Sequence, residues 1–267
     1  MNEAADVPRI TRETIKPQIE VSYGEKTWRP EQTVIDIIQN PLDAHTSVYE
    51  KELLGLVGIH EYKPGDTNQQ ATIALLNDVK YADPENKNAA YVALQQVSDE
   101  LPSQEMLEEQ LDEITYVLPT VQVKVTDGER TQMVPYEDVI HLSADWNIVG
   151  FRVSDIGSGF ASELLGIMGG STKGQSASKR GGLGEGLKMS ITHLMRSGAD
   201  VRLLSRNNDE LWIARPKVDE KKDVSFSVIK RREPEETETG LIVDVDLSSS
   251  IVDPDVKETV STALDTR

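Results

Sequence analysis

The stretch NIVGFRVSDIGSGF, residues 147–160, joins an alternating strand pattern to a glycine-rich turn. Val149, Phe151 and Val153 fall on one face of the predicted strand, because successive side chains of a strand point to opposite faces. The same alternation places Asp155 on the buried side, at the end of the strand. A buried carboxylate requires hydrogen-bond donors, so the pattern predicts a polar site at this end of the strand.

Two glycines follow this aspartate and complete the pattern Asp-x-Gly-x-Gly. Gly157 and Gly159 allow the backbone to turn tightly and a ligand to approach it closely. The amino group of adenine is one donor that would suit Asp155. A β-turn capped by an aspartate has the same pattern, so the pattern alone leaves both interpretations open.

The stretch GGLGEGLKMSITHLM, residues 181–195, places glycines directly before a predicted helix. Backbone N–H groups and the positive end of the helix dipole would suit a polyphosphate there. A flexible linker explains the small residues but not their tight spacing against a helix, and the spacing differs from that of a P-loop. The local charge supports an anion site, because this part of an acidic chain carries the basic residues Lys173, Lys179, Arg180 and Lys188.

The stretch VIDIIQNPLDA, residues 34–44, has the periodicity of a helix. Asp36, Asn40 and Asp43 fall on one side of this helix, and the aliphatic side chains fall on another. Grouped oxygen ligands suit a hard cation such as Mg²⁺, and a carboxylate among them could orient a water for attack on a phosphoryl group. The outer face of an ordinary surface helix has the same pattern, so this segment is not specific by itself.

A proline interrupts this helical pattern. Pro41 lacks a backbone donor and disfavours the helical conformation of the residue before it, Asn40. Taken alone, the proline predicts that the helix ends at Gln39. Taken with the other two segments, it predicts a helix that continues with a kink or local loosening at Asn40 and Pro41.

Taken in their order along the chain, the three segments resemble the motifs of the GHKL superfamily of ATP-binding domains. This superfamily includes the ATP-binding domains of DNA gyrase, the ninety-kilodalton heat-shock chaperone, histidine kinases and mismatch-repair ATPases. The family motif E-x-x-x-N-x-x-D-A is similar to DIIQNPLDA, D-x-G-x-G is DIGSG, and a G-x-x-G-x-G before a helix is similar to GGLGEG. A late Thr-Gly pair resembles ETGLIVDVDL. The matches run from residue 36 to about residue 247.

The resemblance implies an α+β Bergerat fold, a two-layer sandwich with helices on one face of a mixed, mostly antiparallel sheet. It implies ATP and Mg²⁺ as cofactors, beneath a mobile lid at residues 160–184. Asp36 would be the general base, Lys173 would reach the γ-phosphate, Asn40 would hold Mg²⁺, and Asp155 would accept a hydrogen bond from adenine. The remaining implied contacts are Asp43 and Thr239 near the adenine, Gly157 and Gly159 at the adenine turn, and Gly182, Gly184 and Gly186 at the phosphates.

Three departures from the family pattern stand out. Asp36 replaces the glutamate of the hydrolytic members and is one methylene shorter, which puts hydrolysis in more doubt than binding. Leu241 occupies the position where some relatives have a second threonine near the adenine, and Thr239 is the nearest replacement. The chain between the first two motifs is long, so residues 50–115 are predicted to form an inserted helical subdomain.

Three functions are therefore compatible with the sequence. The first is an ATPase whose lid closure drives a conformational or dimerisation change, acting on a transducer domain, a separate partner chain or a second copy. The second is a nucleotide-dependent regulatory module with little turnover, and the third is a GHKL-type protein kinase. No histidine precedes Asp36 to serve as a phosphoacceptor; the histidines, interpreted as surface or core residues, are His45, His60, His141 and His193.

The composition limits the partners. The net charge of −18, from 46 acidic and 28 basic residues, repels phosphate backbones and anionic membranes. Nucleic acid is thus disfavoured as a direct partner unless the basic residues gather on one patch. The chain has no cysteine, which excludes disulfides and is compatible with the cytoplasm, where we expect the protein. No secretory signal or membrane-spanning segment is evident.

The remaining pattern predicts one domain over residues 1–267. A short strand at 18–23 precedes a helix that starts at Pro30 with Thr27 as its cap, and a mostly helical region follows. Alternating segments predict strands at 116–128, 147–157, 199–206, 210–218, 224–232 and 240–249, with a helix at 185–198.

Overall fold

The structure is a computed structural model that describes residues 10–17, 30–98, 101–157, 159–166, 186–207, 210–232 and 239–265. Its strands are β1 (Ile10–Ile15), β2 (Thr120–Thr126), β3 (Thr131–Pro135), β4 (Asn147–Ser154), β5 (Asp200–Arg206), β6 (Glu210–Val218), β7 (Val224–Arg232) and β8 (Gly240–Asp246). Its α-helices are α2 (Pro30–Gly55), α3 (Thr67–Tyr81), α4 (Pro84–Leu94), α5 (Gln104–Glu113), α6 (Gly186–Arg196) and α7 (Pro254–Leu264). Two short 3-10 helices are η1 (Tyr136–His141) and η2 (Ser162–Leu165).

The strands form one sheet in the order β1-β7-β6-β5-β8-β4-β2-β3. Every described pairing is antiparallel, so the α+β class is confirmed but the expectation of a mixed sheet is wrong. The reason is the position of β8 between β4 and β5, the two strands that flank α6. Because β8 is antiparallel to both, the crossover through α6 produces no parallel pair.

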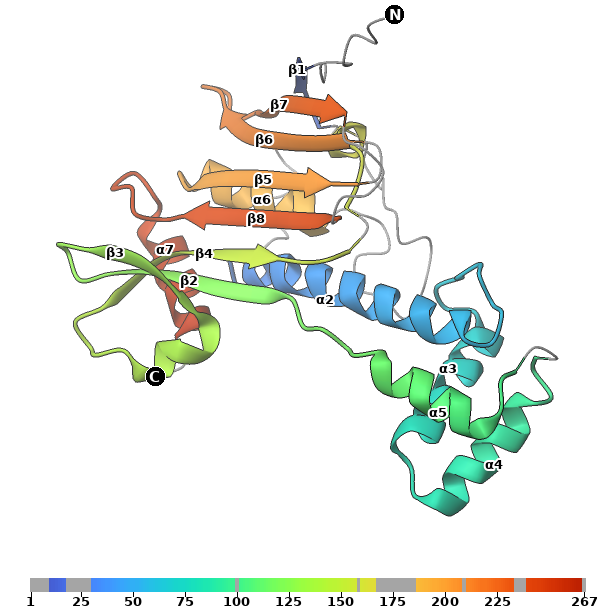
Figure 1. Ribbon diagram of the computed structural model, residues 1–267. Helices are drawn as coiled ribbons and strands as arrows, with labels where there is room; N and C mark the ends of the chain where they lie inside the picture. The colour runs from blue at the N-terminus through green and yellow to red at the C-terminus, as the bar shows by residue number, and fades with distance from the viewer. Residues whose placement is uncertain are drawn as a thin grey trace, which may run out of the picture.

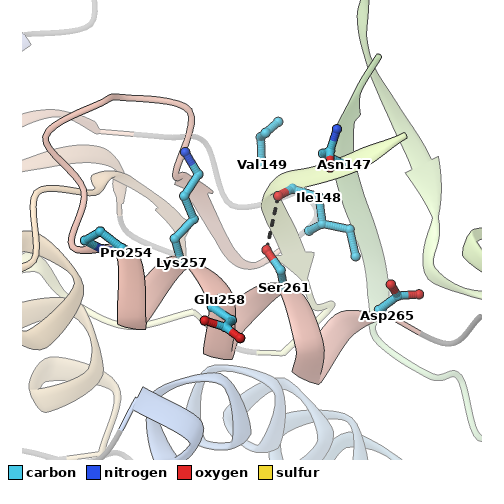
Figure 2. Close-up of a pocket in the computed structure, with 8 residues that line it drawn as sticks. All are labelled: Asn147, Ile148, Val149, Pro254, Lys257, Glu258, Ser261 and Asp265. Atoms are coloured by element: carbon cyan, nitrogen blue, oxygen red, sulfur yellow. Dashed lines mark hydrogen bonds between the residues drawn. The ribbon is translucent and has the colours of Figure 1, made fainter. Parts of the chain in front are cut away.

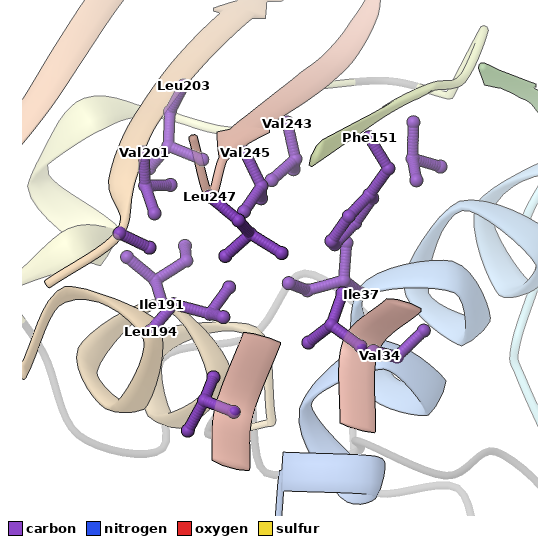
Figure 3. Close-up of a cluster of buried hydrophobic side chains, with 14 of the residues drawn as sticks. Val34, Ile37, Phe151, Ile191, Leu194, Val201, Leu203, Val243, Val245 and Leu247 are labelled. Atoms are coloured by element: carbon purple, nitrogen blue, oxygen red, sulfur yellow. The ribbon is translucent and has the colours of Figure 1, made fainter. Parts of the chain in front are cut away.

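The main core lies between the sheet and helices α2, α6 and α7 (Figure 1). One buried row crosses five neighbouring strands and consists of Val153, Val243, Leu203, Ala214 and Val228. Figure 3 shows aliphatic side chains of α2 and α6 facing this sheet surface, among them Val34, Ile37, Ile191 and Leu194. The alternation predicted from the sequence therefore places one face of the sheet under the helices.

Helix α2 runs through Pro41 without interruption, so the alternative that it ends at Gln39 is wrong. Val34 and Ile37 are buried in the main core, while Leu53 and Leu54 are buried at the other end of the helix. Packing at both ends outweighs the cost of about 3 kcal/mol that an interior proline imposes on an exposed helix.

Residues 56–114, which we call the helical lobe, contain α3, α4 and α5 and lie within the segment predicted as an insertion. Side chains of Asp66, Asp83 and Ser103 accept backbone hydrogen bonds at the start of the three helices. The lobe packs on the C-terminal end of α2 through a second hydrophobic cluster: Leu53, Leu54, Val57, Ile73, Leu76, Val79, Ala90, Leu94, Leu107 and Leu111.

The predicted strands coincide with β2, β4, β5, β6, β7 and β8, and the predicted helix at 185–198 coincides with α6. Elements β1, β3 and α7 have no counterpart in the sequence prediction. Strands β1 and β3 form the two edges of the sheet, where short and half-exposed segments carry a weak alternation. The predicted strand at 18–23 and the cap Thr27 lie outside the described residues. In the described part of the chain, no helix has the length and apolar character needed to cross a membrane.

Candidate functional site

Asp155 directly follows β4 and is half-buried. Its Oδ1 accepts hydrogen bonds from the backbone N–H groups of Gly157, at 2.8 Å, and Leu241, at 3.0 Å. The backbone N–H of Asp155 in turn donates to the carbonyl of Leu241 at 3.0 Å. Because these bonds join the turn after β4 to the start of β8, the orientation of the carboxylate is set by two strands at once.

Two glycines bring the backbone close to this carboxylate. A Cβ on Gly157 would lie 2.8 Å from Ala44 Cβ of α2 and 3.1 Å from Asp155 Oδ1. A Cβ on Gly240, which has a φ of 154°, would lie 2.2 Å from the carbonyl oxygen of Asp155. No side chain fits at either position without displacing neighbouring atoms, so the turn after β4 lies directly against α2 and β8.

Gly186, from the predicted glycine-rich segment at 181–195, is the first residue of α6 and also lies against α2. A Cβ on Gly186 would lie 3.5 Å from Cγ and Oδ2 of Asp36, an ordinary contact distance. The carboxylate of Asp36 is therefore adjacent to the start of α6, where backbone N–H groups and the helix dipole favour negative charge.

The polar residues predicted on α2 are linked to one another and to the helix backbone. Asp36 Oδ1 accepts a hydrogen bond from Gln32 Nε2 at 2.9 Å, and Asp43 Oδ1 accepts one from Gln39 Nε2 at 2.8 Å. Asn40 donates from Nδ2 to the backbone carbonyl of Asp36 at 2.7 Å. Since the amide nitrogen of Asn40 is used in this way, its Oδ1 is the atom suited to a cation.

Gly159 and the residue after it are held by β5 and β6. Gly159 has a φ of 60°, and a Cβ there would lie 2.2 Å from the carbonyl oxygen of Arg206. The backbone N–H of Phe160 donates to Ser205 Oγ at 3.0 Å, and Trp212 Nε1 donates to the carbonyl of Phe160 at 2.6 Å. Neither Ser205 nor Trp212 belongs to a motif, so sequence reasoning missed both.

Some predicted site residues are not part of the described structure. Lys173, Gly182 and Gly184 lie outside the described residues, as does most of the predicted lid at 160–184. Thr239 is described and half-buried, one position before Gly240. Leu241 is buried in the main core and contributes its backbone, rather than a side chain, to Asp155.

One further residue, His45, contacts the turn after β4 and was interpreted as an ordinary surface or core residue from the sequence. Its Nε2 accepts a hydrogen bond from the backbone N–H of Ile156 at 3.0 Å, and its Nδ1 bonds the carbonyl of Val117. Its side chain is only 3% exposed. The sequence feature that could have identified His45 is its position directly after Ala44 on α2. This position is informative only once Gly157 is known to contact Ala44.

A separate open pocket lies between α7 and the start of β4 (Figure 2), and its volume is about 520 Å³. Its lining includes Ile148, Lys257 and Ser261, and Ser261 Oγ donates to the carbonyl of Ile148 at 3.2 Å. This pocket is at the opposite end of β4 from Asp155, and no predicted site residue lines it.

Exposed basic residues occur on the sheet face that α2, α6 and α7 leave uncovered. They include Arg12, Arg215 and Lys217, and they flank Ile213 and Ile229, which are 43% and 44% exposed. Nucleic acid platforms commonly stack bases on aromatic side chains, whereas the exposed side chains between these cations are aliphatic. The expectation that nucleic acid is not a direct partner stays a prediction.

The structure thus brings the segments around Asp155 and Gly186 into contact with the same helix, α2, through Ala44 and Asp36. Neither a scan against protein-family models nor a search of curated proteins found a match.

Proposed function

We infer that this chain is a Bergerat-type ATP-binding domain that hydrolyses ATP with Mg²⁺. The observation that carries the proposal is the convergence of segments that are distant in sequence. Asp36 lies beside Gly186, Ala44 lies beside Gly157, and Asp155 bonds the backbone of Leu241. A chance match to short motifs gives no reason for their residues to meet in this way.

Recognition of the base is assigned to Asp155. Two backbone donors on Oδ1 orient its carboxylate, and a carboxylate held in this way is a suitable acceptor for the amino group of adenine. Gly157 and Gly240 let α2 and β8 pack directly against this turn, which fixes the backbone around the carboxylate. The hydrogen bond would discriminate adenine from guanine, which has a carbonyl in place of the amino group.

The phosphates are assigned to the start of α6 and to Asn40. The first turn of α6 begins at Gly186 next to Asp36 of α2, and the backbone N–H groups of a helix N-terminus suit phosphate oxygens. Mg²⁺ would neutralise charge on the phosphate oxygens, and Asn40 Oδ1 is the protein ligand assigned to it. No group of three or more histidine, cysteine, aspartate or glutamate residues suited to a metal occurs among the described residues. Mg²⁺ bound to a nucleotide takes most of its ligands from phosphates and water, so a single amide oxygen from the protein is assigned to it.

Hydrolysis is assigned to Asp36. A water attacks the γ-phosphorus, the bond from that phosphorus to the β,γ-bridging oxygen breaks, and Asp36 accepts the proton of the water. The leaving group is ADP. The contact between Asp36 of α2 and Gly186 at the start of α6 supports this assignment.

A nucleotide-dependent regulatory module is the second candidate. The observation that favours it is the short side chain of Asp36, whose Oδ1 already accepts a hydrogen bond from Gln32. Such a module would bind ATP and close its lid without appreciable turnover, and would signal to a transducer domain, a partner chain or a second copy. A GHKL-type protein kinase is the third candidate, and no contact among the described residues favours it.

The proposal is tested by calorimetric titration of the chain with ATP and with GTP, both with Mg²⁺, followed by phosphate release under single-turnover conditions. Saturable ATP binding with much weaker GTP binding is expected, together with release of phosphate to water. Binding without release would favour the regulatory module, and transfer of the γ-phosphoryl group to a protein would favour the kinase. No binding of ATP would overturn the proposal.

A further inference from the structure

His45 lies in the third quarter of α2 and makes a hydrogen bond through each ring nitrogen. The backbone N–H of Ile156 donates to Nε2 at 3.0 Å, so Nε2 carries no proton. The ring must then carry its proton on Nδ1, which donates to the carbonyl of Val117. A neutral ring with this one tautomer satisfies both contacts, and the side chain is almost completely buried.

The two partners of His45 come from different parts of the chain. Ile156 lies between Asp155 and Gly157, in the turn that carries the proposed adenine acceptor. Val117 lies in the segment at 114–119 that leads from the helical lobe into β2 and runs beside α2 in Figure 1. The histidine therefore connects the turn after β4 to the segment that returns from the lobe.

Further contacts connect this returning segment to the lobe. The hydroxyls of Tyr116 and Thr46 are 3.0 Å apart, and the ring of Tyr116 packs edge-on against Tyr49 with centroids 5.5 Å apart. Tyr49 donates to Asn77 Oδ1 of α3 at 2.8 Å. Lys80 of α3 donates to the carbonyl of Leu111 at 2.5 Å. A displacement of α3 against α2 would therefore act on the backbone around Val117.

We propose that His45 is a positioning residue for the turn that carries Asp155, and that it couples this turn to the helical lobe. The proposal rests on the proposed function for its ligand, ATP. The histidine does not touch the nucleotide. It holds the backbone of Ile156, and thereby the adjacent carboxylate, in the position that the adenine amino group requires, and a movement of the lobe changes adenine affinity through Val117.

The test compares ATP with inorganic tripolyphosphate, both with Mg²⁺, because tripolyphosphate has no base. His45→Leu and His45→Phe remove both hydrogen bonds, and His45→Gln can replace them with its amide oxygen and nitrogen. The two apolar variants are made in parallel so that the test does not depend on the folding of one of them. His60→Leu is the matched control, since it makes the same substitution at an exposed histidine and leaves both bonds of His45 in place.

In calorimetric titrations we expect the apolar variants to bind ATP roughly tenfold more weakly, as the loss of a buried hydrogen bond allows. Their affinity for tripolyphosphate should equal that of the parent, and His45→Gln and His60→Leu should resemble the parent for both ligands. Parent-like ATP binding by the apolar variants would overturn the proposal. Equal losses for both ligands would also overturn it, because a merely structural role gives that result.

Amide hydrogen exchange tests the coupling without any nucleotide. In the apolar variants, exchange should accelerate at residues 155–157 and at residues 114–118 together, while His60→Leu should leave both segments unchanged. Acceleration at one segment only, or at neither, would refute the coupling. If the parent binds neither ligand, the proposed function fails, and the exchange result still decides whether His45 joins the two segments.

Discussion

Asp36 of α2 and Gly186 of α6 lie side by side, with 3.5 Å between the carboxylate and the position of a Cβ on the glycine. The helical lobe and strands β2, β3 and β4 separate the two residues along the chain, and neither motif identifies its partner. The contact places a carboxylate at the N-terminus of a helix, where negative charge is stabilised. It is the structural basis for assigning both the phosphates and the attacking water to this end of α2.

Replacing Asp155 with asparagine should abolish ATP binding while the fold is retained. Asparagine can keep an oxygen for the N–H groups of Gly157 and Leu241, but it then presents an NH₂ group to the adenine amino group. Calorimetric titration and thermal unfolding check both parts. Asp145→Asn, at an exposed aspartate before the same strand, is the control and should bind ATP normally. Parent-like affinity of Asp155→Asn would refute the assignment.

Replacing Asp36 with asparagine should leave ATP bound but reduce phosphate release by roughly 100-fold or more, because general-base catalysis commonly contributes that much. Single-turnover phosphate release measures the rate, and calorimetry measures binding. Glu52→Gln, at an exposed position of the same helix, should leave both unchanged. If the parent releases no phosphate, the regulatory module is favoured; if Asp36→Asn releases it at the parent rate, another base acts.

Replacing Pro41 with alanine should raise the free energy of unfolding by roughly 1 kcal/mol. The gain comes from relief of an interior-proline cost of about 3 kcal/mol, reduced by a more flexible unfolded chain and by lost packing of the buried ring. Urea denaturation measures this change. The same variant should release phosphate more slowly. Alanine at position 41 has the backbone N–H that proline lacks, and a helical hydrogen bond from it to the carbonyl of Ile37 would shift Asp36 relative to Asn40. An unchanged rate would show that the proline has no catalytic role.

The glycines of the site should respond differently to alanine. Gly157→Ala places a methyl 2.8 Å from Ala44 Cβ, so it should lower the free energy of unfolding by about 1–3 kcal/mol, as overpacking does. Gly186→Ala meets Asp36 at 3.5 Å and should leave stability unchanged or raise it by up to about 1 kcal/mol, through helix propensity. Denaturant unfolding of both variants is the measurement, and equal losses would contradict the contacts described.

Stability should fall as the pH drops below about 6.5, the ordinary pKa of histidine, in part because of His193. Burial lowers the pKa of His193, against the opposing field of Asp253. Between the folded and unfolded pKa values the unfolded chain holds a proton that the folded chain does not, so acid favours unfolding. His193→Gln should flatten the pH dependence in this range, whereas His60→Gln, at an exposed histidine, should not. Identical pH profiles for parent and His193→Gln would contradict this.

Much of the local structure could be predicted from the residues themselves. The alternation of Val149, Phe151 and Val153 predicts β4, and the spacing of Val34, Ile38 and Leu42 predicts a helix through residues 34–44. These patterns are informative because strands and helices repeat over short, fixed periods. Edge strands β1 and β3 carry weaker patterns, and the sequence prediction lacks both of them as well as helix α7.

The sequence by itself determined most of the elements, the order of the motifs and the residue types available at the proposed site. The tertiary structure alone decided that β8 lies between β4 and β5, that Asp36 meets Gly186, and that His45 joins Ile156 to Val117. The physical reason is separation along the chain. Local periodicity states which face of an element is buried, but the partner on the other side of a contact depends on how all the elements pack together.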